Sequence, residues 1–309
     1  MKKSVFIFPG QGAQYSKMGY DFYNNFSIAK DVYDEANDIL NFNLSKIIFE
    51  GSEKELKDTL NSQLGIFVTS VAILKCIYKN FPQIKPFAVA GLSLGEYTAL
   101  FASQRIDFKQ SLELVAKRAK FMTEACLKEK GQMAAVLGLD EKIVEKTINL
   151  LQNEYQIWAA NFNCPNQVVI SGKENAVKKA SELLKEKGAR KIIYLQVQGA
   201  FHSGLMKSAQ DKLQPVILDA NLQDSNIPIV MNVPASFVTS LDLIKKYLIM
   251  QVTSSVRWQM SIENLEKEKV DNYIEIGPSK TLGAMNKKIK VTVPTFSIEK
   301  IEDLDQFIL

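Results

Sequence analysis

Short apolar runs alternate along the chain with longer segments of helical periodicity. Runs typical of buried strands lie at Ser4–Phe8, Phe87–Ala90, near 227–232 and at Tyr273–Ile276. The spacing of apolar positions predicts helices within residues 27–80, after Ser93, over Asp107–Lys130, and near 205–220, 241–250 and 258–269. Because strands that alternate with helices form parallel sheets, we predict an α/β fold with a mostly parallel sheet. Active residues are expected at the carboxyl ends of its strands.

The pattern changes between residues 131 and 199. It predicts a strand, a helix, two strands joined by a turn, a helix and a last strand, at Met133–Leu139, Glu141–Gln152, Ile157–Ala160, Gln167–Ile170, Ala176–Leu184 and Lys191–Val197. This β-α-β-β-α-β order is that of a ferredoxin-like unit. We therefore expect a small domain at 131–199, inserted into a larger domain made of 1–130 and 200–309.

Composition bounds the class of protein. The 309 residues are 46% hydrophobic and 23% charged, with a net charge of +4, which is ordinary for a globular protein. A weak, evenly spread positive charge argues against nucleic acid binding and suits an acidic protein partner. Cys76, Cys126 and Cys164 are odd in number and far apart. We interpret them as reduced packing residues of a cytoplasmic protein.

Targeting and metal-binding signals are weak. The apolar run after Lys3 stops at Pro9, too early for a signal peptide. No stretch approaches the roughly 18 apolar residues of a membrane span, so we expect no membrane contact. The chain has a single histidine, His202, which excludes a multi-histidine metal site. Any chemistry that needs an imidazole must use this residue.

The segment Gly91-Leu92-Ser93-Leu94-Gly95 follows a predicted strand and precedes a predicted helix. Glycine two positions before and after a serine is the pattern of a nucleophile elbow, in which the hydroxyl projects from a sharp turn. The helix that follows directs free N–H groups toward an oxyanion. The alternative is an ordinary serine in a glycine-rich turn.

Arg118 occupies an unusual place on its predicted helix. At about 100° per residue, the other charges gather on one side, whereas Arg118 falls within the apolar arc that includes Met122. A guanidinium is costly to bury without a partner. We predict an arginine that lines a cleft and binds an anionic substrate; a structural ion pair with a carboxylate is the alternative.

Five segments and one arginine together resemble one family. They are FPGQGAQYSKMG at 8–19, GLSLGEYTAL at 91–100, Arg118, GAFHSGLM at 199–206, QVTSSVRW at 251–258 and IEIGPSKTLGAM at 274–285. In this order they resemble the malonyl-CoA:acyl-carrier-protein transacylases, and they are similar to the acyltransferase domains of polyketide synthases. The resemblance implies a hydrolase-like α/β core with a ferredoxin-like insertion. One departure is Leu92, where the family usually has histidine; we expect the chemistry to survive and contacts at the cleft wall to differ.

The resemblance also implies catalytic roles. Ser93 is the expected nucleophile and His202 its base, with the backbone carbonyl of Gln251 holding the second imidazole nitrogen; a carboxylate in that place is the alternative. The oxyanion hole is expected to consist of the backbone N–H groups of Gln11 and Leu94.

Substrate recognition is expected from three side chains. Arg118 would pair its planar fork with the malonyl carboxylate. Phe201 resembles the family's malonyl-type pattern and would crowd an α-methyl branch, and Met122 is expected to line the same site. Neither a metal nor a bound cofactor is implied.

The implied reaction is a ping-pong transfer of malonyl from malonyl-CoA to Ser93 and then to the phosphopantetheine thiol of acyl carrier protein. We expect a cytoplasmic monomer that serves fatty acid synthesis. Candidate docking charges for the acidic carrier are Arg190, Lys191, Lys287 and Lys288, which are equally consistent with ordinary solvated side chains. The alternatives are an acyltransferase of a polyketide pathway, a serine esterase or thioesterase, and a non-catalytic binding module.

Overall fold

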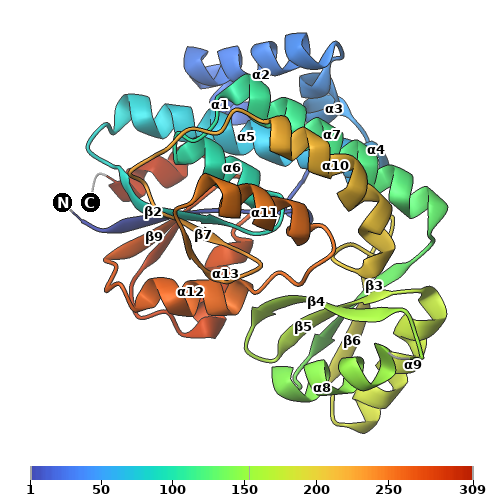
Figure 1. Ribbon diagram of the computed structural model, residues 1–309. Coiled ribbons are helices and arrows are strands. Elements are labelled where there is room, and N and C mark those ends of the chain that lie inside the picture. The colour runs from blue at the N-terminus through green and yellow to red at the C-terminus, as the bar shows by residue number, and fades with distance from the viewer. Residues whose placement is uncertain (1, 153, 308–309) are drawn as a thin grey trace.

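The computed structural model describes residues 2–152 and 154–307 and contains two β-sheets (Figure 1). The larger sheet has the strand order β10-β9-β1-β2-β7-β8. Its strands are β1 (Ser4–Phe8), β2 (Pro86–Gly91), β7 (Ile229–Met231), β8 (Ser236–Val238), β9 (Asn272–Ile276) and β10 (Thr295–Ile298). Only β8 runs antiparallel to its neighbour, so the prediction of a mostly parallel sheet is confirmed.

Helices cover both faces of this sheet (Figure 1). On β1, Phe6 and Phe8 pack into the core that contains α5 (Thr59–Asn80) and α6 (Gly95–Ala102). Val5 and Ile7 point the other way, into a second core with α12 (Trp258–Glu266) and α13 (Thr281–Ile289). Alternate residues of a strand face opposite sides, so a strand with helices on both sides is apolar throughout.

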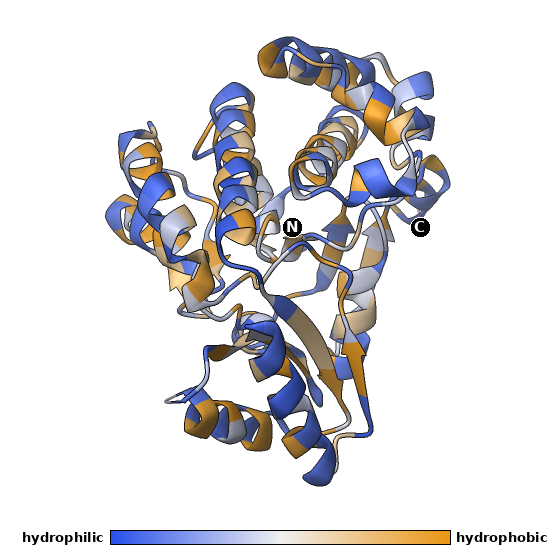
Figure 2. Cartoon of the chain, turned by 90° about the vertical axis from the view of Figure 1, so that its right-hand side faces the viewer, coloured by the Kyte–Doolittle hydropathy of each residue, from blue (hydrophilic) through white to orange (hydrophobic). Residues whose placement is uncertain are grey.

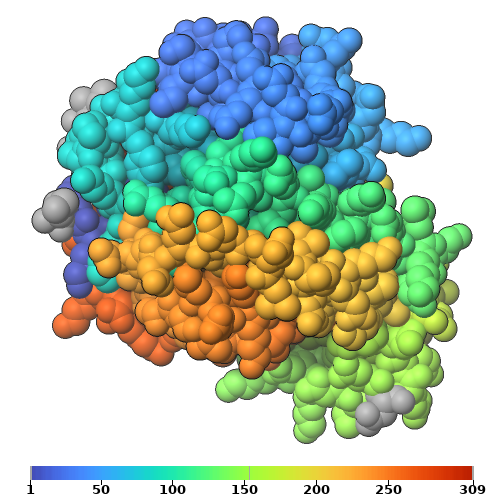
Figure 3. Space-filling view, turned by 45° about the horizontal axis from the view of Figure 1, so that its top comes forward, coloured from blue at the N-terminus to red at the C-terminus, as the bar shows by residue number. Residues whose placement is uncertain are grey.

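Further helices build an outer layer over the first face. They are α1 (Tyr20–Asn25), α2 (Ser27–Leu40), α3 (Leu44–Glu50), α4 (Glu53–Lys57), α7 (Phe108–Lys128), α10 (Lys207–Asp219) and α11 (Leu241–Gln251). Figure 3 shows α7, in green, between the blue N-terminal helices and the gold α10. Helix α7 packs on α5 and α10, and this placement brings residues from distant parts of the chain together.

Helix α5 corrects one expectation. Its 22 residues are long and apolar enough to cross a membrane, with a mean hydropathy of 1.5 over its most apolar stretch, although no such stretch was expected. In the structure 83% of that stretch is buried inside the protein. The helix is apolar on most sides because other helices and the sheet surround it.

The smaller sheet is antiparallel and has the order β4-β5-β3-β6. It consists of β3 (Gln132–Leu137), β4 (Ile157–Cys164), β5 (Gln167–Gly172) and β6 (Lys191–Tyr194), with α8 (Glu141–Gln152) and α9 (Glu174–Glu186). On β3, Ala134 and Val136 face these helices, whereas Met133 and Ala135 face the larger core. In Figure 2 the helices carry both blue and orange segments, as amphipathic helices do.

Several boundaries differ from the expectations. Strand β4 continues to Cys164, so the predicted turn is shorter and centres on Pro165 and Asn166. Strand β6 ends at Tyr194 and not at Val197, because the chain then leaves the sheet toward the loop that carries His202. Helices α1 and α13, strands β8 and β10 and the 3₁₀ segment η2 (Ile301–Phe307) do not correspond to any predicted element. The helix expected near 205–220 begins as the 3₁₀ segment η1 (Gly204–Met206) and continues as α10. All three cysteines are buried and free of disulfides.

Candidate active site

Ser93 lies in a tight turn between β2 and α6, at the carboxyl end of the parallel sheet. Its φ is 53°, in the left-handed region that non-glycine residues seldom adopt. A Cβ added to Gly91 would lie 1.9 Å from the Gly95 carbonyl carbon, and one added to Gly95 would lie 2.2 Å from the Phe8 carbonyl oxygen. Backbone on both sides of Ser93 therefore approaches too closely for any side chain, which explains the two glycines of the elbow.

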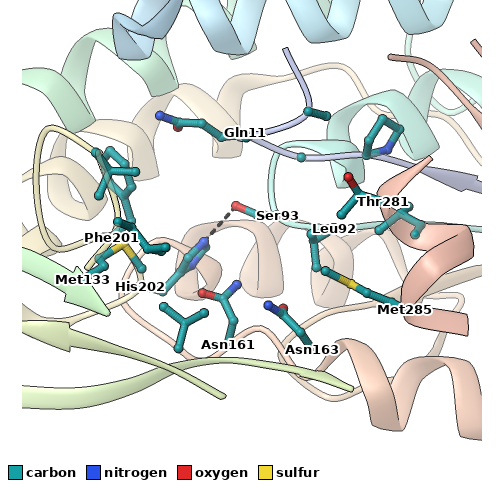
Figure 4. A pocket seen from close by; sticks show the side chains of 18 of the residues that line it. Gln11, Leu92, Ser93, Met133, Asn161, Asn163, Phe201, His202, Thr281 and Met285 are labelled. Carbon is teal, nitrogen blue, oxygen red and sulfur yellow. Dashed lines mark hydrogen bonds between the residues drawn. The ribbon is translucent and has the colours of Figure 1, made fainter. Parts of the chain in front are cut away.

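His202 lies next to Ser93, although 109 positions separate them in the sequence. Its Nε2 is 2.8 Å from Ser93 Oγ (Figure 4), and its Nδ1 is 2.8 Å from the carbonyl oxygen of Gln251. Since a carbonyl oxygen only accepts, the proton of the neutral imidazole sits on Nδ1 and donates to Gln251. Nε2 is then free to accept the hydroxyl proton of Ser93. The second nitrogen is thus held by a backbone carbonyl and not by a carboxylate.

The environment keeps His202 neutral. Its side chain is almost fully buried, and burial together with the positive charge of Arg118 lowers its pKa from 6.5 to about 4. The hydrogen bond to Gln251 acts in the opposite direction. A neutral imidazole at pH 7 is the form that accepts a proton from an alcohol.

Arg118 points into the same site from the buried side of α7. One Nη2–H group donates to Ser93 Oγ and another to Gln251 Oε1, each at 3.0 Å, while Nη1 donates to Gln63 Oε1 at 2.5 Å. Within residues 2–152 and 154–307 it forms no salt bridge, so the alternative of a structural ion pair is wrong for this part of the chain. Burial lowers the pKa of Arg118, against the opposing influence of Tyr97 and Glu96.

The two amide N–H groups expected in the oxyanion hole lie on different segments. Gln11 follows β1, and Leu94 precedes the first turn of α6. In the described part of the chain neither N–H donates to a protein acceptor, so both are free for a ligand. Figure 4 places Gln11 across the cavity from His202, with Ser93 between them.

Three polar residues were missed by sequence reasoning. Gln63 lies on α5 with no exposed surface and holds Arg118, as described above. Asn232 follows β7 and accepts the Ser93 N–H at 2.7 Å through Oδ1. Glu96, on the first turn of α6, accepts from the Asn232 N–H and from Gln251 Nε2, each at 2.5 Å. In the sequence, Gln63 could have been noticed as a polar residue within an apolar helix. Asn232 could have been noticed because it follows a predicted strand, where active residues are expected.

A cavity of about 200 Å³ opens onto Ser93 (Figure 4). Around Arg118 its wall is formed by Phe201, Met122 and Met133, which are almost fully buried. Toward the other end it is lined by Leu92, Thr281 and Met285 on one side and by Asn161 and Asn163 on the other. The cavity thus combines an apolar wall with a few convergent polar groups, which is typical of a small-molecule site.

Comparisons with known proteins agree with this geometry. Residues 5–294 match the family model described as an acyl transferase domain. The chain is 41% identical over 306 residues to the malonyl CoA-acyl carrier protein transacylase of Bacillus subtilis, spanning 99% of this chain and 96% of that protein. The chain belongs to the malonyl CoA-acyl carrier protein transacylase family. Among solved structures, the family member from Clostridium perfringens has a TM-score of 0.93 at 36% identity, covering 99% and 96% of the two chains.

Another similar structure is a malonyl-transacylase in complex with the acyl-carrier protein of a type II polyketide synthase. It has a TM-score of 0.94 at 33% identity and covers 98% of both chains. Because the match covers nearly the whole chain, it includes both β-sheets.

Within the described residues no group of three or more histidine, cysteine, aspartate or glutamate side chains could hold a metal ion.

In the present chain, Leu92 stands where the family usually has histidine, and it lies at the cavity wall. Its side chain is partly buried, packs against the core of α12 and α13, and lines the cavity with Met285. It does not take part in the contacts between Ser93 and His202. The residue that directly precedes the nucleophile in the sequence is therefore apolar and not titratable.

The single imidazole gives a direct test of the electrostatics. In an NMR titration of the folded protein, the one histidine signal should titrate with a midpoint near pH 4, because burial and Arg118 disfavour the charged form. In urea the midpoint should return toward 6.5. Between these values the unfolded chain binds the extra proton, so folding stability should fall as pH falls through this range. A midpoint near 6.5 in the folded protein contradicts the described environment.

The elbow glycines give a stability test. Gly95→Ala places a methyl group against the Phe8 backbone, and we expect it to lower the free energy of unfolding by about 3 kcal/mol. Gly188→Ala is the matched control, because it has a φ of +102° but no atom within 4 Å of the added methyl. Its cost should be conformational only, about 1–2 kcal/mol. Urea unfolding measures both; a smaller loss for Gly95→Ala than for the control contradicts the steric account.

Proposed function

We propose that the protein transfers a malonyl group from malonyl-CoA to the phosphopantetheine thiol of acyl carrier protein, through a covalent malonyl-Ser93 intermediate. One observation carries the proposal: the Ser93 hydroxyl contacts both the imidazole of His202 and the guanidinium of Arg118 at the base of one cavity. The imidazole supplies a base and the guanidinium a site for an acyl group that ends in a carboxylate. The names and structures of the relatives support the same reaction.

In the first half of the reaction, His202 Nε2 takes the Ser93 proton as Oγ attacks the thioester carbonyl. The tetrahedral oxyanion accepts hydrogen bonds from the Gln11 and Leu94 N–H groups. The C–S bond then breaks, and the imidazolium returns its proton to the departing coenzyme A thiolate. In the second half, the carrier thiol gives its proton to His202 as its sulfur attacks the malonyl ester carbonyl. The C–O bond to Ser93 then breaks, and the imidazolium returns the proton to Ser93 Oγ.

Arg118 gives the site its selectivity for a dicarboxylic acyl group. Within the described residues its hydrogen-bond partners are neutral oxygens of Gln63, Gln251 and Ser93, and no ion pair neutralises its positive charge. A malonyl carboxylate supplies the missing counter-charge through paired N–H···O bonds. Phe201 and Met122 limit the space around this group, which disfavours an α-methyl branch.

The acidic carrier would dock near the mouth of the cavity. In the smaller sheet, Lys191 and Gln167 lie opposite Leu137 on the two strands that flank β3. Lys288 of α13 donates a hydrogen bond to the side chain of Gln167. Arg190 and Lys287 adjoin these two lysines and are exposed, so the four charges gather around one end of this sheet. Together they would attract an acidic protein.

We infer the remaining properties from the same reasoning. The reaction needs no metal or cofactor, and the protein acts as a cytoplasmic monomer. The larger sheet and its helices are a hydrolase-like core, into which residues 131–199 are inserted as a ferredoxin-like unit. The favoured role is to supply malonyl groups to fatty acid synthesis. Service to a polyketide pathway is the second candidate, because one similar structure contains a polyketide carrier.

The intermediate can be tested by intact mass spectrometry. Incubation with malonyl-CoA should add one malonyl group to the wild-type chain, and addition of holo acyl carrier protein should remove it. Ser93→Ala should show no adduct, because no other hydroxyl contacts His202 Nε2 in the described structure. An adduct that persists on Ser93→Ala contradicts the assigned nucleophile. Rapid turnover of p-nitrophenyl esters without a thiol acceptor would indicate an esterase instead.

Selectivity tests the role of Arg118. Arg118→Ala should lower the rate of malonyl transfer by roughly 10–100-fold relative to acetyl transfer, because an acetyl group has no carboxylate to lose. Arg118→Lys keeps the charge without the planar fork and should show an intermediate preference. The measurement is kcat/KM with malonyl-CoA and acetyl-CoA under the same conditions. Equal losses with both donors contradict the role.

A further inference from the structure

A carboxylate that is not part of the cavity lies directly behind the nucleophile. Glu96 has no exposed surface and follows Ser93 by three residues, on the first turn of α6. Both of its oxygens accept hydrogen bonds, Oε1 from the backbone N–H of Asn232 and Oε2 from Nε2 of Gln251, each at 2.5 Å. It does not line the cavity, so it does not touch the acyl group.

Both partners of Glu96 hold the backbone of the elbow. Asn232 accepts the Ser93 N–H through Oδ1 and donates to the Gly91 carbonyl through Nδ2, each at 2.7 Å. Gln251 Nε2 donates to the Ser93 carbonyl at 2.9 Å. One buried carboxylate thus orients the groups that fix both peptide units of Ser93.

The same carboxyl group helps to hold the Gln251 side chain in its orientation. A carboxamide has an accepting end and a donating end, which differ little in shape. The NH₂ end of Gln251 donates both to Glu96 Oε2 and to the Ser93 carbonyl oxygen, which only accepts, so these two contacts hold that end away from Arg118. The oxygen end is then directed at Arg118, whose Nη2 it holds at 3.0 Å.

We propose that Glu96 is a positioning residue that, by fixing the orientation of the Gln251 carboxamide, aims Arg118 at the carboxylate of the acyl donor. The inference rests on the proposed malonyl transfer and names a further determinant of its selectivity. The contrasting hypothesis is that Glu96 only stabilises the fold, in which case its loss would lower transfer of every donor to the same extent.

The charged and titratable groups around Glu96 are consistent with this role. Arg118 faces it from α7 and Tyr97 adjoins it on α6, while His202 lies on the far side of Gln251. Burial raises the pKa of Glu96 to about 8, so the carboxyl group is largely protonated at neutral pH, whereas its two donors and Arg118 favour the ionised form. The role assigned to Glu96 rests on its hydrogen bonds to Asn232 and Gln251 and not on its charge. Replacement by glutamine places an NH₂ group against either the Asn232 N–H or the Gln251 NH₂ group. Either clash displaces the carboxamide whose oxygen holds Arg118.

The experiment compares kcat/KM for malonyl-CoA and acetyl-CoA in Glu96→Gln. We expect the malonyl-to-acetyl ratio to fall about tenfold, the effect of one misdirected charge-assisted hydrogen bond. Glu275→Gln is the matched control. Glu275 is also a fully buried carboxylate, and it accepts from the Leu282 and Gly283 N–H groups and from the Ser297 hydroxyl. This control should reduce stability and leave the donor ratio at its wild-type value.

Glu96→Asp is the second variant, and it also serves if Glu96→Gln does not fold. It keeps the carboxyl group but is one methylene too short to reach both donors, so its ratio should fall as well. Equal losses with both donors in Glu96→Gln, or a wild-type ratio in folded Glu96→Asp, overturn the inference. A wild-type enzyme without malonyl preference refutes the proposed function and this inference with it. A wild-type preference that folded Glu96→Gln retains refutes this inference alone.

Discussion

The structure depends on a buried cation that forms no salt bridge with any carboxylate in residues 2–152 and 154–307. Removing a guanidinium from water costs several kcal/mol, and an ion pair is the usual compensation. Arg118 instead donates to the neutral oxygens of Gln63, Gln251 and Ser93, which compensate its hydrogen bonds but not its charge. An anion that enters the cavity would therefore gain more binding free energy than it would beside an arginine that already forms an ion pair. In the proposed reaction, the binding and selectivity of the acyl donor follow from this charge.

Gln251 couples the base to the guanidinium. Its backbone carbonyl accepts from His202 Nδ1, its side-chain oxygen accepts from Arg118, and its side-chain nitrogen donates to the Ser93 carbonyl. These three contacts come from one residue at the end of α11 that has no exposed surface. A shift of this residue would disturb the proton acceptor, the carboxylate site and the nucleophile at once. The buried network around Glu96 restrains such shifts.

Much of this arrangement could be predicted from the sequence, and the reasons are specific. Ser93 stands in a local motif, His202 is the only histidine, and Arg118 breaks the polar–apolar pattern of its own helix, so each carries a signal within its own segment. Gln63 and Asn232 carry no signal of comparable strength within their own segments. Their roles come from contacts with Arg118 and Ser93, which lie 55 and 139 positions away in the sequence. The strand β6 ends early for a similar reason: the loop to His202, and not the local β-propensity, decides where the chain leaves the sheet.

The low pKa of His202 and the charge of Arg118 are parts of one mechanism. In the free protein the guanidinium helps to lower the imidazole pKa to about 4, which keeps Nε2 unprotonated but makes it a weak base. When a malonyl carboxylate pairs with Arg118, it offsets the positive field at His202, and the imidazole becomes more basic at the moment when Ser93 must lose its proton. An acetyl group brings no such charge. In the proposed reaction, the donor with the carboxylate would thus bind more strongly and also make His202 a stronger base, so the selectivity would have two components that share one origin.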